Sequence, residues 1–299
     1  MKLYAPKYYK EFACIADKCR HSCCVGWEID VDGEALKTYK TLDGYGKEIV
    51  KSIDYCDAPH FKLAENDRCP HLNGRGLCRI ILELGEEYLC DICREHPRFY
   101  NNTAHGREVG IGMACEEACR IILNSDEYAE IVEVGEAVGM TESAGFDAIS
   151  HRAHIYLLLA DIQSPYTERL RKIREAYGAD PSKISDCEWK KLIGSLEYLD
   201  GSHKEMFSAY SSSDETPSEL EKLLERAFAY FVFRHCSEAR DEMDFRAALG
   251  LSLFCERLLA SVVKNGECGV EATLEAARII SEEIEYSEDN TETVKYRFF

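Results

Sequence analysis

Cysteine placement constrains this chain more than any other sequence feature. Eleven of its fifteen cysteines fall within residues 1–120. The first four, Cys14, Cys19, Cys23 and Cys24, lie within eleven residues. Side chains of adjacent residues diverge, so either one of Cys23 and Cys24 binds a metal while the other packs, or the two face separate centres. A chain of 299 residues needs no metal to acquire a core. We therefore interpret the thiols as ligands for a functional metal centre.

Further thiols follow in two groups. Cys69 and Cys78 precede a CxxC pair at Cys90 and Cys93, and Cys115 and Cys119 are one helical turn apart. Glycines at 74 and 76 allow the backbone to fold closely around a bound centre. Zinc and iron–sulfur clusters both take thiolate ligands. A zinc ribbon usually carries two CxxC pairs and this chain has one, so single cysteines from several segments favour an iron–sulfur cluster, with zinc as the alternative.

The amino-terminal residues and the longest apolar run indicate the compartment. The stretch MKLYAPKYYKEFACIADKC has no apolar core of the kind found in signal peptides. The run IYLLLA at 155–160 is too short to span a bilayer. We expect a soluble cytoplasmic protein without a membrane partner. In a reducing cytosol, clustered cysteines indicate thiolate ligation or redox chemistry rather than structural disulfides.

Charge is distributed unevenly along the chain. Lys plus Arg minus Asp plus Glu is 17 − 20 = −3 for residues 1–120 and 19 − 35 = −16 for the remainder. An acidic field repels phosphate backbones and attracts basic surfaces. The charge excludes nucleic acid as an expected partner and favours a basic, lysine-bearing protein, although an acidic surface also simply keeps a protein in solution.

The composition changes near residue 125, and this change predicts two domains. A loop-rich, cysteine-rich metal-binding domain is expected at 1–124, with short β segments near 60–63 and 107–113. An acidic α-helical domain is expected at 125–299, because apolar residues recur there at helical spacing. The stretches with this spacing are 148–163, 187–199, 218–236, 244–264 and 271–286. The predicted fold class is mainly α, with a helical bundle after the metal-binding half.

Several familiar catalytic patterns are absent. Cys19 and Cys23 begin the spacing of a radical S-adenosylmethionine site, but the third cysteine does not follow at the required position. No GxGxxG follows a strand pattern, so the usual nucleotide fingerprint is missing. Histidines such as His21, His71 and His96 lie among so many thiols that none is singled out as a catalytic partner.

Four stretches together resemble the flagellin lysine N-methylase family, a branch of the proteins with a CxxCxxCC-type zinc- or iron-chelating domain. They are FACIADKCRHSCCVGWEIDVD at 12–32, CPHLNGRGLCRI at 69–80, LGEEYLCDICREHPR at 84–98 and ACEEACR at 114–120. The segment AYFVFRHC at 229–236 is a weaker point of likeness. The resemblance covers the first 120 residues, and the chain is short for the family.

The resemblance implies a metal-binding set of eight cysteines: Cys14, Cys19, Cys23, Cys24, Cys69, Cys78, Cys93 and Cys115. Cys90 and Cys119 look like additions to the family pattern. The resemblance also implies transfer of a methyl group from S-adenosylmethionine to lysines of flagellin by a protein that carries an iron–sulfur centre, expected as 4Fe–4S. The alternative is an iron–sulfur or zinc protein that carries electrons or senses metal without catalysis.

Methyl transfer to lysine requires a neutral amine, although the ordinary lysine pKa is about 10.4. The site must therefore favour deprotonation through apolar burial or a nearby base. The sequence does not choose a catalytic base or a donor site. Arg98, Arg234 and His235 are the polar groups of interest, each with a structural alternative as a helix cap or a packed polar pair, and Tyr88, Tyr100 and Tyr230 are among the tyrosines that could assist.

Overall fold

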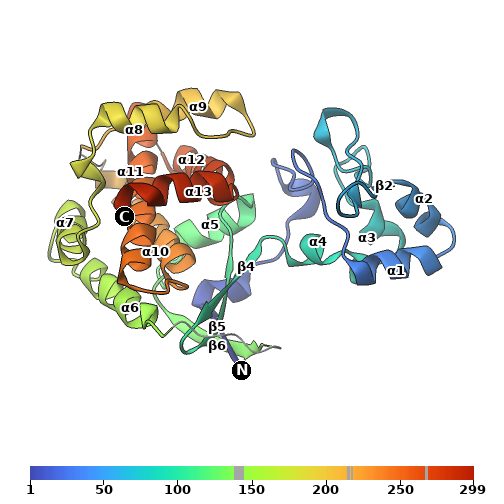
Figure 1. The fold of residues 1–299 in the computed structure, drawn as a ribbon, viewed down its shortest axis with the longest axis horizontal. Coiled ribbons are helices and arrows are strands. Elements are labelled where there is room, and N and C mark those ends of the chain that lie inside the picture. The colour runs from blue at the N-terminus through green and yellow to red at the C-terminus, as the bar shows by residue number, and fades with distance from the viewer. Residues whose placement is uncertain (138–144, 214–215, 217, 267–268) are drawn as a thin grey trace. The chain divides into compact units, whose positions relative to one another are not determined.

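The computed structural model describes residues 1–137, 145–213, 216, 218–266 and 269–299 (Figure 1). The chain divides into two compact units. The cysteine unit comprises Ala13–Arg98, and the helical unit comprises Met1–Phe12 together with Phe99–Phe299. The fold is mainly α, as the sequence predicts.

Strand pairing explains why the first twelve residues belong to the helical unit. A four-stranded sheet runs in the order β4-β5-β1-β6. Its strands are β1 (Lys2–Pro6), β4 (Arg98–Thr103), β5 (Gly106–Ile111) and β6 (Ile131–Glu136). β1 pairs in parallel with β5 and antiparallel with β6. The cysteine unit is thus inserted between β1 and β4, a division that differs from the one at residue 124 expected from composition.

The helical unit is built around two long buried helices. Its helices are α5 (Glu116–Asn124), α6 (Ala148–Leu159), α7 (Tyr166–Tyr177), α8 (Asp186–Ile193), α9 (Gly201–Phe207), α10 (Glu221–Cys236), α11 (Glu242–Asn265), α12 (Val270–Ile280) and α13 (Glu288–Lys295). α10 packs along α11, and α5 and α12 pack against them. α11 is buried along almost its whole length, which explains its continuous apolar sequence. A π-helical turn, η7 (Ser281–Glu285), follows α12.

The cysteine unit has shorter elements and a separate core. Its helices are α1 (Gly33–Thr41), α2 (Tyr45–Lys51), α3 (Arg79–Glu83) and α4 (Asp91–Glu95), and its strands are β2 (Ile53–Asp54) and β3 (His60–Phe61). The Asp32 side chain begins α1 by accepting hydrogen bonds from the backbone N–H groups of Glu34 and Ala35. The same carboxylate accepts from the N–H of Asp91 at 2.8 Å, which ties α1 to α4. The core includes Tyr39, Phe61 and two cysteines.

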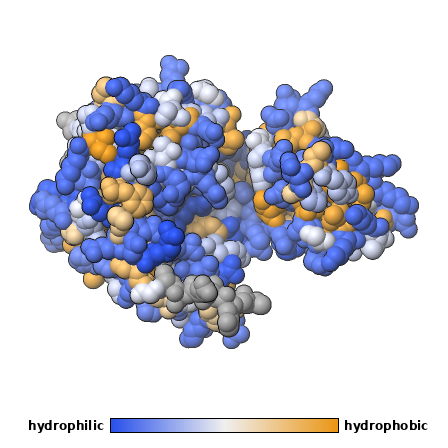
Figure 2. Space-filling view, in the orientation of Figure 1, coloured by the Kyte–Doolittle hydropathy of each residue, from blue (hydrophilic) through white to orange (hydrophobic). Residues whose placement is uncertain are grey.

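Surface properties agree with the composition of the second half. Figure 2 shows a face of the helical unit on which hydrophilic residues surround scattered apolar ones. Among the residues that the structure describes, no helix combines the length and apolarity that a bilayer crossing requires.

Candidate metal centre

Six thiols gather in the cysteine unit, and we call them the thiol cluster. Its members are Cys23, Cys24, Cys69, Cys78, Cys90 and Cys93. Cys69 and Cys90 lie in the core of the unit, and three other members pack against that core. Five of the six belong to the set implied by the family resemblance. The sixth, Cys90, is 1% exposed and lies beside Cys93.

The adjacent cysteines Cys23 and Cys24 lie in the segment before α1. The Sγ atoms of Cys23 and Cys24 are 3.9 Å apart. The Trp27 indole N–H donates to the Cys23 carbonyl at 2.9 Å, which closes a tight turn around the pair. The backbone N–H of Cys69 donates to the Cys24 carbonyl at 2.8 Å. Backbone hydrogen bonds therefore join the first cysteine segment to the second.

A closed loop brings Cys69 and Cys78 together. The Asn73 side chain accepts hydrogen bonds from the N–H groups of Arg75 and Leu77, at 2.8 and 3.1 Å. Gly76 adopts a φ of +75°, a conformation that favours glycine. Leu72 and Cys78 form an isolated antiparallel bridge. The stretch between the two cysteines thus turns back on itself and returns Cys78 towards Cys69.

The CxxC pair lies at α4. Cys90 is the residue before the first turn, and Cys93 is inside the helix, so both thiols lie on one helical turn. A hydrogen bond with Cys93 lowers the pKa of the Cys90 thiol. The same contact, together with burial, raises the pKa of Cys93, and the charges of nearby thiolates add to that rise.

The pKa values of Cys23 and Cys24 shift in opposite directions, as those of Cys90 and Cys93 do. The hydrogen bond from Cys24 lowers the pKa of Cys23 to about 7. The pKa of Cys24 is raised by that contact and by burial. In each close pair, one thiol is therefore favoured as a thiolate, and a positive metal centre would stabilise the second thiolate.

The chemistry of the donor set fits a soft metal. Thiolate sulfur is the ligand of structural zinc and of iron–sulfur clusters, and each of these centres takes four protein ligands. Six thiols exceed that number, so two of them either pack beside one centre or belong to a second. Thiolate chemistry therefore suits zinc and iron–sulfur centres alike. Among the described residues, however, no three of these sulfur atoms lie within 4.8 Å of one another, which is the close spacing that the ligands of one ion adopt.

The remaining cysteines named from the sequence have other surroundings. Cys14 is exposed and accepts a hydrogen bond from the N–H of Ala16 at 3.4 Å. The Cys19 thiol donates to the His21 carbonyl at 2.7 Å. Cys115 belongs to the helical unit, where it precedes α5. The roles of these three cysteines as ligands stay predictions.

Two further N-terminal cysteines lie outside the thiol cluster. Cys119 is buried in the helical unit and its thiol donates to the Leu274 carbonyl at 3.3 Å. Cys56 is exposed and lies beside Asp54, which raises the pKa of its thiol. Cys119 is therefore a packed core residue of the helical unit, and Cys56 is a surface residue.

The polar residues at the end of α10 form a buried network in the helical unit. The Glu285 carboxylate accepts from His235 Nε2 at 2.7 Å and from the Tyr230 hydroxyl at 3.1 Å, and it pairs with Arg234 Nε at 3.3 Å. Burial alone would raise the pKa of Glu285, but Arg234 and His235 hold that pKa below its usual value. Tyr286 packs on the Arg234 guanidinium and is 46% exposed, so the network reaches the surface there. The sequence pointed to Tyr230, Arg234 and His235 and missed Glu285.

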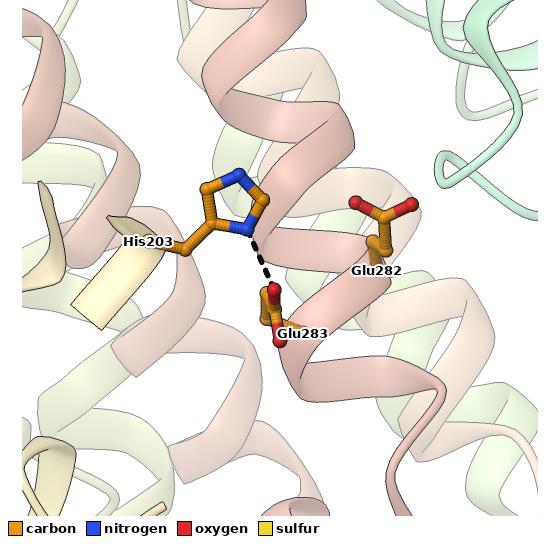
Figure 3. Close-up of side chains that lie close together, drawn as sticks. All are labelled: His203, Glu282 and Glu283. Atoms are coloured by element: carbon orange, nitrogen blue, oxygen red, sulfur yellow. Dashed lines mark hydrogen bonds and ion pairs between the residues drawn. The ribbon is translucent and has the colours of Figure 1, made fainter. Parts of the chain in front are cut away.

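A second group of polar side chains lies at the other end of the π-helical turn. Among the described residues, the ligand atoms of one set of three possible metal ligands lie within 4.8 Å of one another: His203, Glu282 and Glu283. Figure 3 shows the His203 ring turned towards Glu283, while the Glu282 carboxylate projects from another side of the turn.

The contacts of this group indicate a structural role. Glu283 accepts from His203 Nδ1 at 2.6 Å and from the N–H groups of Leu199 and Asp200, at 2.8 and 3.1 Å. Glu282 is paired with Arg278 at 3.0 Å. Since these partners already satisfy both carboxylates, the group anchors the segment before α9 to the π-helical turn.

Comparison with known proteins finds partial matches to proteins named lysine-N-methylase. A protein named lysine-N-methylase from Salmonella typhimurium is 26% identical over 136 residues, which cover 43% of this chain and 34% of that protein. The lysine-N-methylase of Salmonella choleraesuis matches over 137 residues with the same identity and coverage. The flagellar biosynthetic protein FliU of Salmonella muenchen is 26% identical over 136 residues and is covered over 80% of its length. The match thus spans about a third of the length of the two lysine-N-methylases. No family model and no solved structure matches the chain.

Proposed function

We propose that this chain is a cytoplasmic protein-lysine N-methyltransferase that uses S-adenosylmethionine, modifies a flagellin-type substrate and carries a thiolate-bound iron–sulfur centre. The observation that carries the proposal is the match to lysine-N-methylases over 43% of the chain. The thiol cluster supplies the ligands, and the name of FliU supplies the flagellar context.

The reaction has a simple balance of atoms. The lone pair of the neutral lysine Nζ attacks the methyl carbon of S-adenosylmethionine, and the bond from that carbon to the sulfonium sulfur breaks. S-adenosylhomocysteine leaves, and the proton lost from the amine passes to a base or to water. The protein must hold the methyl group in line with the amine and exclude water from the site.

The chain's own residues contribute in two ways. The thiol cluster would hold the metal centre, which would supply redox-active iron when bound. The net charge of −16 after residue 120 attracts a lysine-bearing protein surface over long range, an effect that salt weakens. Association with the substrate should therefore slow as ionic strength rises.

A methyl-transfer assay tests the proposal. Anaerobically purified, metal-replete protein is incubated with S-adenosylmethionine labelled in its methyl group and with flagellin from the same source. We expect label in flagellin lysines, abolished by Cys69→Ser and unaffected by Cys187→Ser, because Cys187 is exposed in the helical unit and lies outside the thiol cluster. Absence of transfer, together with absence of donor binding by calorimetry, contradicts the enzyme. Reversible reduction of a bound centre without transfer would instead identify a redox or sensor protein.

A further inference from the structure

His71 is a buried imidazole in the loop between Cys69 and Cys78. It is 3% exposed, and both of its ring nitrogens have partners. Nδ1 lies 2.8 Å from the Tyr45 hydroxyl, and Nε2 lies 2.9 Å from the Ser52 hydroxyl. Both partners come from α2 and its end. The imidazole therefore links the cysteine loop to a neighbouring helix.

The hydrogen bonds determine which nitrogen carries the proton. The Ser52 hydroxyl donates to the Ile49 carbonyl at 2.6 Å, so its oxygen accepts from Nε2–H of His71. Nδ1 then has a lone pair and accepts from the Tyr45 hydroxyl. Since neither nitrogen is available to a metal in this arrangement, His71 is not itself a ligand.

Aromatic contacts fix the ring further. Phe61 meets His71 edge-on with ring centroids 4.7 Å apart, and Tyr45 does so at 5.8 Å. The Arg79 guanidinium stacks over Tyr45 at 4.2 Å from its centroid. Arg79 directly follows Cys78. His71, which follows Cys69 by two residues, and Arg79, which follows Cys78, therefore both contact the Tyr45 ring.

The backbone of His71 connects this anchor to the sulfur ligands. Its carbonyl accepts from the N–H of Arg79 at 2.7 Å, and its own amide lies beside the Cys69 sulfur. A shift of the imidazole would therefore move the backbone on which both cysteines depend. In metal proteins, groups that orient the ligands contribute strongly to metal retention.

We propose that His71, held by Tyr45 and Ser52, is a positioning residue that fixes the Cys69–Cys78 loop in a ligand-ready geometry. The inference rests on the thiolate centre proposed above, and it adds residues that keep that centre in place. Each partner contributes one hydroxyl, so each can be deleted without a large change in volume.

Metal release tests the inference on the full-length protein. Wild type, Tyr45→Phe, Ser52→Ala and His71→Leu are purified anaerobically, and their metal content, visible spectrum and rate of metal loss to a chelator are measured. We expect metal loss to accelerate about 10- to 100-fold for His71→Leu, with an altered spectrum, and by less for each hydroxyl deletion. Tyr55→Phe is the matched control, because Tyr55 is 52% exposed in the same unit.

The outcomes separate the two proposals. Wild-type protein without bound metal would contradict the thiolate centre, and the positioning role would fail with it. Metal-loaded wild type with release rates and spectra unchanged in all three variants would overturn the positioning role alone. A lower melting temperature of the metal-free variants, without faster metal release, would also overturn it. If His71→Leu does not fold, Tyr45→Phe and Ser52→Ala decide the result.

Discussion

The two units of this chain have different kinds of side chain in their cores. The core of the helical unit is formed by large apolar side chains on long helices, with Trp189, Tyr230 and Phe254 fully enclosed. In the cysteine unit, Cys69 and Cys90 occupy core positions, and the helices span five to nine residues. Short helices are marginal by themselves, and a small core provides limited stabilisation. The contrast indicates that hydrophobic burial stabilises the helical unit. Under the proposed function, metal ligation would add to the stability of the cysteine unit.

Removal of the metal should have the largest effect, and it should act on one unit. Thiolate ligation contributes its binding free energy to folding, so chelation should destabilise residues 13–98 far more than the helical unit. Hydrogen–deuterium exchange before and after chelation measures this difference. Loss of amide protection should extend across the cysteine unit while α10 and α11 stay protected. Equal loss of amide protection in both units would contradict a stabilising role of the metal confined to the cysteine unit.

Phe254→Ala should affect the other unit. Phe254 is fully buried in α11 and packs against Trp189 and Tyr210, with ring centroids 4.7 and 5.3 Å away. Removing the ring should lower the free energy of unfolding by about 4 kcal/mol. Chemical denaturation measures the loss, and the metal content of the folded protein should not change. If Phe254→Ala lowered the metal content but left the free energy of unfolding unchanged, the result would contradict two separate cores.

Glu285→Gln should destabilise the helical unit by about 3 kcal/mol near neutral pH, because it leaves the buried charge of Arg234 without its partner. Arg234 and His235 lower the pKa of Glu285 in the folded protein. The ionised Glu285 carboxylate therefore stabilises the fold at pH values above its pKa in the unfolded chain, about 4.5. This stabilisation is lost as the pH falls through the lower pKa that Glu285 has in the folded protein. The difference between wild type and variant should shrink below pH about 4.5 in denaturation curves. A constant difference across that range would disprove the assignment.

Two helix caps offer the smallest and most closely matched comparison. Asp32 caps α1 in the cysteine unit, and Ser185 forms a capping box with Glu188 in the helical unit. Replacement of either residue by Ala should cost about 1 kcal/mol of stability. Asp32→Ala should also accelerate metal release, because the carboxylate holds the N–H of Asp91 next to Cys90. Equal metal release from both variants would show that this link does not support the centre.

Local patterns predicted much of the helical unit. The apolar spacing at 244–264 corresponds to α11 (Glu242–Asn265), and the stretch at 218–236 contains α10. The helix α7 was not predicted, although Pro165 precedes it and Gly178 ends it with a φ of +67°. These two residues are the signals that could have identified it.

Long-range pairing and burial could not be predicted from local patterns. The partner of β1 is more than a hundred residues away, so no window of sequence shows that the first strand joins β5 and β6. The segment SEEIEY looks like a solvated helix end, yet a π-helical turn places Glu283 and Glu285 inside the protein. For the thiol cluster, spacing indicated all six members, including Cys90 in the CxxC pair. The family resemblance implied five of them and discounted Cys90, which the fold places in the core.

Metal and sulfide analysis of the anaerobically purified full-length protein, with an optical spectrum, would show whether the thiol cluster binds an iron–sulfur centre. We predict iron with inorganic sulfide, a broad visible absorbance that bleaches on reduction, and loss of both iron and absorbance in Cys69→Ser but not in Cys187→Ser. A colourless protein with stoichiometric zinc would contradict the iron–sulfur assignment. Wild-type protein that retains no metal, with the cysteine unit folded and stable, would contradict a metal centre in the thiol cluster.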